Sequence, residues 1–228
     1  MELQMDGLIV LDKPAGITSA AAVGRVKRLL PRGVKVGHAG TLDPFATGVL
    51  LVLVGRGTKS SQKLMDQAKQ YDATIKLGAN TATDDLDSVE VLHASAAAVT
   101  LEQIEIACRR FSGVISQRPP AFSALKIVGQ PAYKLARKGQ APELAAREVR
   151  IDRFEILSWE HPLLKVRIGC GRGTYIRAIA RDLGEMLGTG GYLTELRRTR
   201  IGDFDVADAV TLDRLQSEGI TAHLQKLE

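Results

Sequence analysis

The stretch Val36-Gly37-His38-Ala39-Gly40-Thr41-Leu42-Asp43-Pro44 leads into the apolar run Val49-Leu50-Leu51-Val52-Leu53-Val54. A short apolar run bounded by glycines is typical of a buried strand, so we expect this run in the core. His38 and Asp43 are then expected in a loop that the core holds in place, and such loops often carry catalytic residues. Taken alone, an Asp before a Pro is more typical of a turn or a helix N-cap than of a nucleophile.

The length and composition favour one globular domain over residues 1–228. The chain has 228 residues, of which 45% are hydrophobic and 25% charged, which is ordinary for a soluble protein with one large core. No apolar run is long enough to span a membrane, and residues 1–6 do not resemble a signal segment, so we expect a cytoplasmic protein. Cys108 and Cys170 are expected to be buried, reduced thiols. The four histidines lack ligand spacing, so no metal site is expected.

The charge is unevenly distributed along the chain. The net charge is +5, but residues 106–150 carry nine Lys or Arg against two Glu, whereas residues 61–105 carry three Lys against eight acidic residues. A basic segment of this kind is typical of a phosphate-binding surface, although a solvated surface with uneven charge fits this observation equally well.

The hydrophobic pattern predicts an α+β fold with a mixed, largely antiparallel sheet flanked by helices, because strands and helices alternate without a regular βαβ repeat. We expect strands over residues 7–11, 49–54, 71–77, 149–159 and 163–169. We expect helices over residues 20–30, 60–65, 101–111 and 132–137, a well-marked helix from Ile176 to Leu187, and a marginal one over residues 211–228. The acidic residues 83–88 are predicted to form a loop.

Two tyrosines and an arginine occupy suggestive positions. Tyr71 stands at the entry of a predicted strand, and Tyr175 and Arg177 fall in the first turn of the well-marked helix. A cation there faces the positive end of the helix dipole, which suggests an anionic partner. Considered alone, this helix somewhat favours the other interpretation, a surface arginine that points away from the helix axis.

Nearly the whole chain resembles the TruB family, the tRNA pseudouridine-55 synthases. The resemblance rests on six motifs in the order of the family: residues 11–19, residues 37–50, Lys69-Gln70-Tyr71, residues 119–126, Gly173-Thr174-Tyr175-Ile176-Arg177 with Asp182-Leu183-Gly184, and Leu196-Arg197-Arg198-Thr199. It implies a pseudouridine synthase fold with an RNA-clamping insertion, and an enzyme that flips a uridine of the tRNA T-arm and isomerises it.

The resemblance also implies the catalytic residues. Asp43 is similar to the essential aspartate of the family, which either attacks C1′ or promotes loss of a 2′ proton. Arg177 is expected to pair with Asp43. Tyr71 resembles the tyrosine that stacks on the target base and removes the C5 proton.

Further residues are implied to bind the substrate. His38 resembles a histidine that enters the RNA stack, Tyr175 and Leu196 match residues that line the uracil pocket, and Lys13 is placed among the substrate-binding residues. The basic insertion, about residues 118–150, is expected to contact the RNA backbone through Lys126, Lys134, Arg137 and Lys138. No cofactor, metal or obligatory protein partner is implied, and we expect a monomer.

Two alternatives remain beside this interpretation. One is a guide-RNA-dependent synthase like dyskerin, and the other is a non-catalytic chaperone that refolds the T-arm. The chain ends soon after residue 215, so a C-terminal PUA-like RNA-binding domain is not expected, which favours a stand-alone enzyme.

Overall fold

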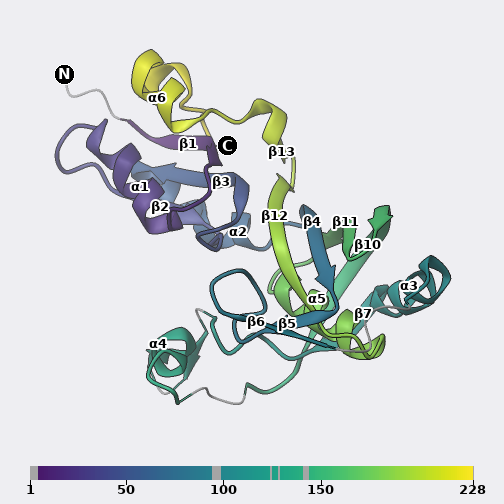
Figure 1. Cartoon of the computed structure of the whole chain (residues 1–228). Helices are drawn as coiled ribbons and strands as arrows, with labels where there is room; N and C mark the ends of the chain where they lie inside the picture. The colour runs from purple at the N-terminus through teal and green to yellow at the C-terminus, as the bar shows by residue number, and fades with distance from the viewer. Residues whose placement is uncertain (1–4, 94–98, 124, 128, 141–143, 228) are drawn as a thin grey trace. The chain divides into compact units, whose positions relative to one another are not determined.

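The computed structural model describes residues 5–93, 99–123, 125–127, 129–140 and 144–227. These residues form two compact units (Figure 1). Unit 1 combines the chain up to Tyr71 with the chain from Leu196 onward, and unit 2 is Asp72–Glu195. The boundaries fall inside two strands, so each of these strands contributes one part to each unit. The α+β class with a mixed, largely antiparallel arrangement of strands is confirmed.

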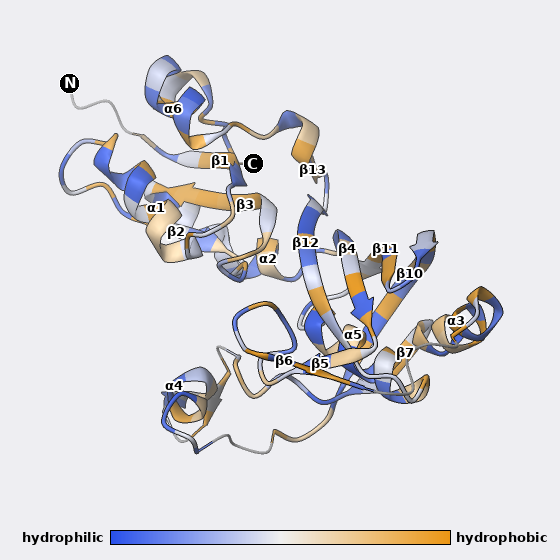
Figure 2. Ribbon diagram, viewed as in Figure 1, coloured by the Kyte–Doolittle hydropathy of each residue, from blue (hydrophilic) through white to orange (hydrophobic). Residues whose placement is uncertain are grey.

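The sheet of unit 1 is built around β3 (Thr47–Val54), which is buried along nearly its whole length. β1 (Gly7–Lys13) and β2 (Val36–Ala39) are antiparallel to β3, and β12 (Gly191–Ile201) is parallel to it at Arg197 and Arg198. A short strand, β13 (Phe204–Asp205), extends β12. Figure 2 shows most of β3 as hydrophobic, as expected for a strand that is covered on both faces.

Helices cover both faces of this sheet. Successive residues of β1 point to opposite faces, so β1 contributes to the packing on each of them. Ile9 and Leu11 pack in one cluster with Val26 of α1 (Ser19–Arg28) and Leu215 of α6 (Leu212–Glu218). Leu8 and Val10 pack in another cluster, with Leu64 of α2 (Ser61–Met65). The 3₁₀ segments of unit 1 are η1 (Gly55–Ser60), η4 (Val206–Asp208) and η5 (Ile220–Ala222).

Unit 2 has the strand order β4-β11-β10-β7, formed by β4 (Lys69–Leu77), β11 (Leu163–Cys170), β10 (Arg147–Glu160) and β7 (Gly113–Gln117). β10 is antiparallel to both of its neighbours. The longer helices of unit 2 are α3 (Leu101–Cys108), which continues into η3 (Arg109–Phe111), and α5 (Ile176–Met186). Two short hairpins and a short helix complete the unit: β5 (Ala79–Thr81) with β6 (Glu90–Leu92), β8 (Lys126–Ile127) with β9 (Gln130–Pro131), and α4 (Ala132–Ala136).

Most of the predicted elements are present, but the structure also differs from the prediction. Eight of its strands were not expected: β2, β5, β6, β7, β8, β9, β12 and β13. His38 lies in the strand β2 and not in a loop, because residues 36–39 pair with the end of β3. The predicted helix over residues 211–228 is limited to α6 and the short η5. Cys108 and Cys170 are buried as expected. None of the helices in the described ranges has the length and apolar character needed to cross a membrane.

Candidate active site

Asp43 lies in the connection between β2 and β3 of unit 1, and it is half-buried. The backbone of this connection is held by side chains that come from distant parts of unit 1. Arg198 of β12 donates hydrogen bonds from its guanidinium to the carbonyl oxygens of Gly40 (3.1 Å), Thr41 (3.4 Å) and Val49 (2.8 Å). Arg198 is only 1% exposed. A buried guanidinium is tolerated here because backbone oxygens satisfy its donors.

The other end of the same connection is held from the first motif of the chain. The Ser19 hydroxyl accepts a hydrogen bond from the amide of Leu42 (2.8 Å) and donates one to the carbonyl oxygen of Leu42 (3.1 Å). The carbonyl oxygen of Pro44 accepts from the amide of Gly16 (2.9 Å) and from the Lys13 ammonium (3.2 Å). Lys13 also donates to two carbonyl oxygens of its own motif.

As a result, every carbonyl oxygen from Gly40 to Pro44 accepts a hydrogen bond, since that of Asp43 itself accepts from the amide of Ala46 (3.2 Å). A segment whose carbonyl oxygens all accept hydrogen bonds, as those of residues 40–44 do, has little freedom to change conformation. The backbone that carries the Asp43 carboxylate is therefore fixed before any substrate binds, which is what a catalytic group requires.

Two cations, Lys13 and Arg198, lie within electrostatic range of each other and of this connection. Burial lowers the pKa of Lys13 from 10.5 to about 8, the charge of Asp43 opposes that shift, and Arg198 adds to it. His38 has a lowered pKa because of burial and, second, the charge of Arg198. The ring is therefore neutral at pH 7. Its Nδ1 atom is buried and has no hydrogen-bond partner among the described residues.

The structure places Tyr71 and Leu196 in unit 1, at the two points where the chain passes between unit 1 and unit 2. Tyr71 is the third residue of β4 and is 8% exposed, and Leu196 lies in β12 and is 7% exposed. Next to them, Gln70 and Thr199 are joined by hydrogen bonds that link the two strands within unit 1. Unit 1 thus holds Lys13, His38, Asp43, Tyr71 and Leu196 of the predicted site.

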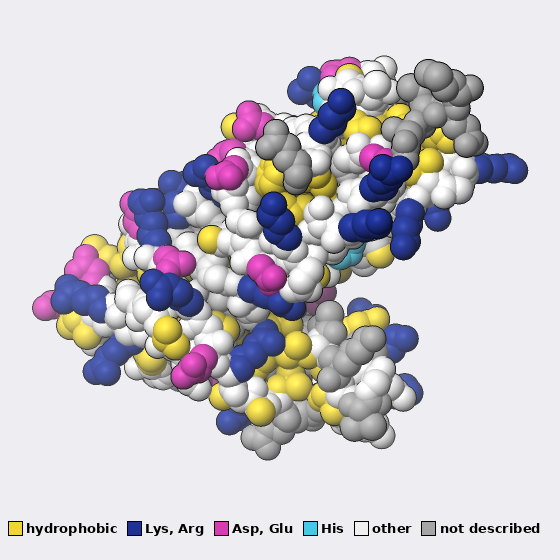
Figure 3. Space-filling view, turned by 180° about the vertical axis from the view of Figure 1, so that it is seen from behind, with side chains coloured by type: hydrophobic (Ala, Val, Ile, Leu, Met, Phe, Trp, Pro, Cys, Tyr) yellow, Lys and Arg dark blue, Asp and Glu magenta, His cyan; other side chains and the backbone are white. Residues whose placement is uncertain are grey.

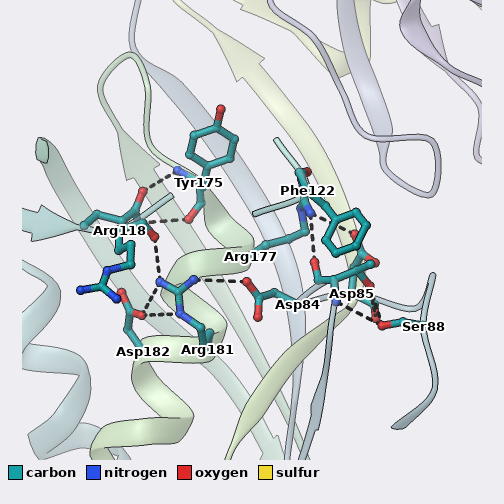
Figure 4. A network of polar contacts seen from close by, with 11 residues as sticks. Asp84, Asp85, Ser88, Arg118, Phe122, Tyr175, Arg177, Arg181 and Asp182 are labelled. Atoms are coloured by element: carbon teal, nitrogen blue, oxygen red, sulfur yellow. Dashed lines mark hydrogen bonds and ion pairs between the residues drawn. The ribbon is translucent and has the colours of Figure 1, made fainter. Parts of the chain in front are cut away.

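Arg177 and Tyr175 belong to unit 2, at the start of α5. Arg177 is 3% exposed and lies 3.4 Å from a carboxylate oxygen of Asp85, whose side chain is equally buried (Figure 4). Arg177 also donates to the carbonyl oxygens of Thr83 and Phe122, each at 3.0 Å. The anionic partner that its position suggested is therefore present inside unit 2. The predicted pairing of Arg177 with Asp43 stays a prediction.

A second ion-pair group lies beside the first (Figure 4). Arg181 contacts Asp84 at 3.3 Å and Asp182 at 2.7 Å, and it donates to the carbonyl oxygen of Arg118 at 2.8 Å. Burial raises the pKa of Asp84 to about 6, although Arg181 and Arg177 oppose that shift. The acidic residues 83–88 are a loop, as predicted, but Asp85 is a buried structural anion and not a solvated one.

Tyr175 is held where the basic insertion leaves the sheet. Gln117, the last residue of β7, accepts from the amide of Tyr175 (2.8 Å) and donates to its carbonyl oxygen (3.1 Å). The guanidinium of Arg147, the first residue of β10, lies 5.2 Å from the centre of the Tyr175 ring. Arg147 also donates to the carbonyl oxygen of Gly173. Both ends of the insertion therefore meet at Tyr175.

The basic insertion exposes three of the four residues that were expected to bind RNA. Lys134, Arg137 and Lys138 are exposed on and after α4, and the Arg137 guanidinium lies 5.7 Å from the centre of the Tyr133 ring. The backbone of Lys126 lies in β8, but its side chain is outside the part of the chain that the structure describes. Residues 147–150, which were included in the predicted insertion, belong to β10.

Sequence reasoning missed three residues that support the site: Arg198, Asp85 and Gln117. Arg198 was quoted within a motif, but nothing in the sequence indicated that it is buried against a connection about 150 residues earlier. Asp85 was hidden in an acidic stretch, and Gln117 precedes two prolines. Across the described ranges, no group of three or more His, Cys, Asp or Glu residues is placed to hold a metal ion.

Comparisons with known proteins agree on one family. Residues 27–176 match the model described as TruB family pseudouridylate synthase (N terminal domain), and residues 177–227 match the model of the tRNA pseudouridylate synthase B C-terminal domain. The chain is 50% identical to tRNA pseudouridine synthase B of Mycobacterium sp. (strain KMS) over 221 residues, which cover 95% of this chain and 74% of the relative. The relative of the same name from Aromatoleum aromaticum is 48% identical over 213 residues, covering 93% of this chain and 68% of the relative.

Solved structures support the fold. The chain is similar to one in the crystal structure of a Cbf5-Nop10-Gar1 complex, with a TM-score of 0.72 and 31% identity over 96% of this chain. It is also similar to one in the archaeal box H/ACA sRNP Nop10-Cbf5 complex, with a TM-score of 0.69 and 30% identity over 97% of this chain. It spans 58% and 59% of those two chains.

The fold, together with the fixed aspartate connection and the matched models, defines a pseudouridylate synthase. Within that class, the chain belongs to the TruB family.

Proposed function

We propose that this protein isomerises a uridine in the T-arm of tRNA, at position 55, to pseudouridine. Membership of the TruB family and about half identity to proteins named tRNA pseudouridine synthase B support the reaction and the substrate. The observation that carries the proposal is the connection from Gly40 to Pro44, because its hydrogen-bonded backbone presents one aspartate, Asp43, next to two buried cations.

Asp43 is proposed as the essential carboxylate. In the reaction the C1′–N1 bond breaks, the uracil rotates, a C1′–C5 bond forms, and the C5 proton is lost while N1 gains a proton. An ionised carboxylate either attacks C1′ or promotes loss of a 2′ proton, and both roles need it charged and correctly oriented. We propose that Arg177 pairs with Asp43 and that Tyr71 removes the C5 proton.

The target base has to leave the RNA stack before the C1′–N1 bond is accessible, at a cost of a few kcal/mol. Stacking on Tyr71 is proposed to offset part of this cost, because base–aromatic stacking contributes about 1–3 kcal/mol per base. His38 is proposed to fill the vacated place in the stack. Its lowered pKa supports this role, since a neutral ring enters stacked bases without having to shed the hydration of a charge. Tyr175, Leu196 and Lys13 are proposed to complete the substrate-binding residues.

The basic insertion is proposed to hold the RNA backbone through Lys126, Lys134, Arg137 and Lys138. The exposure of Lys134, Arg137 and Lys138 supports this role. Each phosphate that such residues neutralise releases counterions, so the binding affinity should fall steeply as salt increases.

The guide-RNA-dependent alternative is not favoured, because over the aligned regions this chain is 48–50% identical to the proteins named tRNA pseudouridine synthase B and 30–31% identical to the chains of the Cbf5 complexes. A single catalytic domain, a monomeric state and a cytoplasmic location stay predictions from the sequence. Assistance in tRNA folding is compatible with catalysis by the same surfaces.

The test is to incubate the wild type and Asp43→Asn with a T-arm stem-loop transcript. Pseudouridine is mapped by primer-extension stops after carbodiimide treatment. Asp203→Asn is the matched control, because Asp203 is an exposed acid between β12 and β13. We expect a stop at the target uridine with the wild type and with Asp203→Asn, and none with Asp43→Asn. A stop of equal strength with Asp43→Asn would contradict the role of Asp43, and no stop with the wild type would contradict the function.

A further inference from the structure

A second basic surface lies in unit 1, whereas the insertion belongs to unit 2. It is formed by Arg25, Lys27, Arg28, Arg32 and Lys35. We name these five residues the α1–β2 surface, because they lie on the last turns of α1 and on the connection to β2. All five are exposed. They belong to a stretch, residues 13–42, that contains six Lys or Arg and no Asp or Glu. Figure 3 shows further exposed Lys and Arg side chains on the face of unit 1 that is turned away from the viewer in Figure 1.

These five cations lack the acidic partners that some exposed arginines of the molecule have. Arg150, Arg153 and Arg214, for example, each pair with a nearby carboxylate. Within the described part of the chain, no hydrogen bond or ion pair joins a side chain of the α1–β2 surface to another residue. Asp213 of α6 borders the hollow that Arg25 and Arg28 line, so the surface has one acid close by.

Helix stability does not account for the whole surface. Arg25, Lys27 and Arg28 lie in the last turn of α1, where a cation stabilises the helix by about 0.3–1 kcal/mol. Arg32 and Lys35 follow the end of the helix and gain nothing from its dipole. Lys27, Arg28 and Arg32 instead line a shared hollow of about 370 Å³. Like charges held together without counter-charges repel one another, and a bound polyanion relieves that repulsion.

The α1–β2 surface continues into the candidate site through β2. Lys35 immediately precedes β2, and His38 lies three residues further along the strand. A strand rises about 3.3 Å per residue, so Lys35 and His38 are about 10 Å apart along the chain. An RNA whose nucleotides reach His38 therefore has its neighbouring phosphates within range of Lys35, the end of this surface that adjoins β2.

We propose that the α1–β2 surface binds backbone phosphates of the tRNA substrate, as a second contact region in addition to the basic insertion. This inference rests on the proposed function for the identity of the RNA. The phosphates belong either to the T-arm itself or to the rest of the tRNA, and the two sources can be separated by experiment.

The test compares the wild type with the triple variant Lys27→Gln/Arg28→Gln/Arg32→Gln. Affinities for a full-length unmodified tRNA transcript and for its isolated T-arm stem-loop are measured by filter binding between about 50 and 200 mM salt. We expect Kd of the tRNA to rise roughly tenfold to a hundredfold at about 100 mM salt, and the slope of log K against log salt to fall in magnitude by about 2–3. An equal loss for the stem-loop assigns the phosphates to the T-arm, and a loss for the tRNA alone assigns them to the rest of the molecule.

Two control variants accompany this measurement. Arg109→Gln/Arg110→Gln/Lys165→Gln removes three exposed cations of unit 2 and should change Kd by no more than about twofold. Lys27→Arg/Arg28→Lys/Arg32→Lys keeps the charges and should bind like the wild type, which separates lost charge from a damaged helix. Unchanged affinity and slope in the Gln variant, or an equal loss in the unit 2 control, would overturn the proposal. Pseudouridine formation by the wild type is scored separately, so a failure of the proposed function is recognised independently.

Discussion

The guanidinium of Arg198 donates a hydrogen bond to the carbonyl oxygen of Gly40 at 3.1 Å, three residues before Asp43. In the parallel pairing of β12 with β3, Arg198 lies opposite Gly48, and its guanidinium also donates to the carbonyl oxygen of Val49. A residue late in the chain thus contacts the backbone on both sides of Asp43. The position of the Asp43 backbone therefore depends on how β12 is seated against β3.

Replacing Arg198 by Met should destabilise unit 1. Three carbonyl oxygens lose their donor, and a buried unsatisfied group costs about 1–3 kcal/mol. We expect a loss of about 3 kcal/mol or more, which lowers Tm by roughly 6–12 °C in a chain of this size. Circular dichroism melting checks this. Arg200→Met is the control, because Arg200 is exposed and should change stability by no more than about 0.5 kcal/mol. Equal melting of both variants would contradict the role of Arg198.

The pKa of Lys13, lowered by burial to about 8, predicts opposite effects of pH on stability and activity. Between pH 8 and 10.5 the unfolded chain binds the proton that the folded chain has lost, so stability rises with pH in this window and not below it. Activity should fall above pH 8, because Asp43 loses the ammonium near it. The neutral amine also has two donors for three carbonyl oxygens.

Single-turnover rates between about pH 6 and 10 measure this effect, since a group with a pKa near 8 changes its charge within that range. In Lys13→Arg the side chain stays charged throughout, so the decline should move to higher pH. A decline at the same pH in both proteins would assign it to another group.

Substitutions of Arg177 and Asp85, which form a buried pair, should have strongly coupled effects on the free energy of unfolding. Arg177→Met leaves the Asp85 carboxylate buried without this cation, which costs about 3–5 kcal/mol. Adding Asp85→Asn removes that uncompensated charge, so the double variant should be more stable than the two single losses predict, by about 1–3 kcal/mol. Urea unfolding of the wild type, both single variants and the double variant gives the coupling. Strictly additive losses would show that the pair does not act as one unit.

Gly48 is expected to tolerate no side chain. Its φ is +100°, and a Cβ there would lie 2.1 Å from the carbonyl oxygen of Arg198. Gly48→Ala must therefore separate β12 from β3, and we expect a loss of several kcal/mol, on the scale of the largest single-site effects. Gly33 is a matched control, because its φ is +89° but a Cβ there meets open space. Gly33→Ala should cost only the backbone strain of about 1–2 kcal/mol, and similar unfolding midpoints of the two variants would refute the steric argument.

Much of the fold was predictable because hydrophobic periodicity shows it directly. The runs in β1, β3 and β11, the capping box of α3 and the apolar face of α5 all lead to correct elements. β12 was missed because its second half carries Arg197, Arg198 and Arg200, which break the pattern of a buried strand. Arg198 is buried only because carbonyl oxygens about 150 residues away accept its hydrogen bonds, and no local pattern shows that.

The candidate site was predictable only as far as the motifs reach. The six motifs named Asp43, Tyr71 and Arg177, and their roles stay predictions. The motifs did not indicate that His38 lies in a strand, because β2 has only four residues and includes a glycine. They also did not reveal Asp85, since an acid in a run of acids resembles a solvated loop until its partner is known.

The meeting of Gln117 and Arg147 at Tyr175 has a mechanical consequence. These two residues are opposite each other in the pairing of β7 with β10, so the intervening chain leaves and re-enters the sheet at one place. A single proteolytic cut within residues 118–146 would leave both new fragments anchored by strand pairing. The nicked protein should therefore stay associated under native conditions and separate only in denaturant.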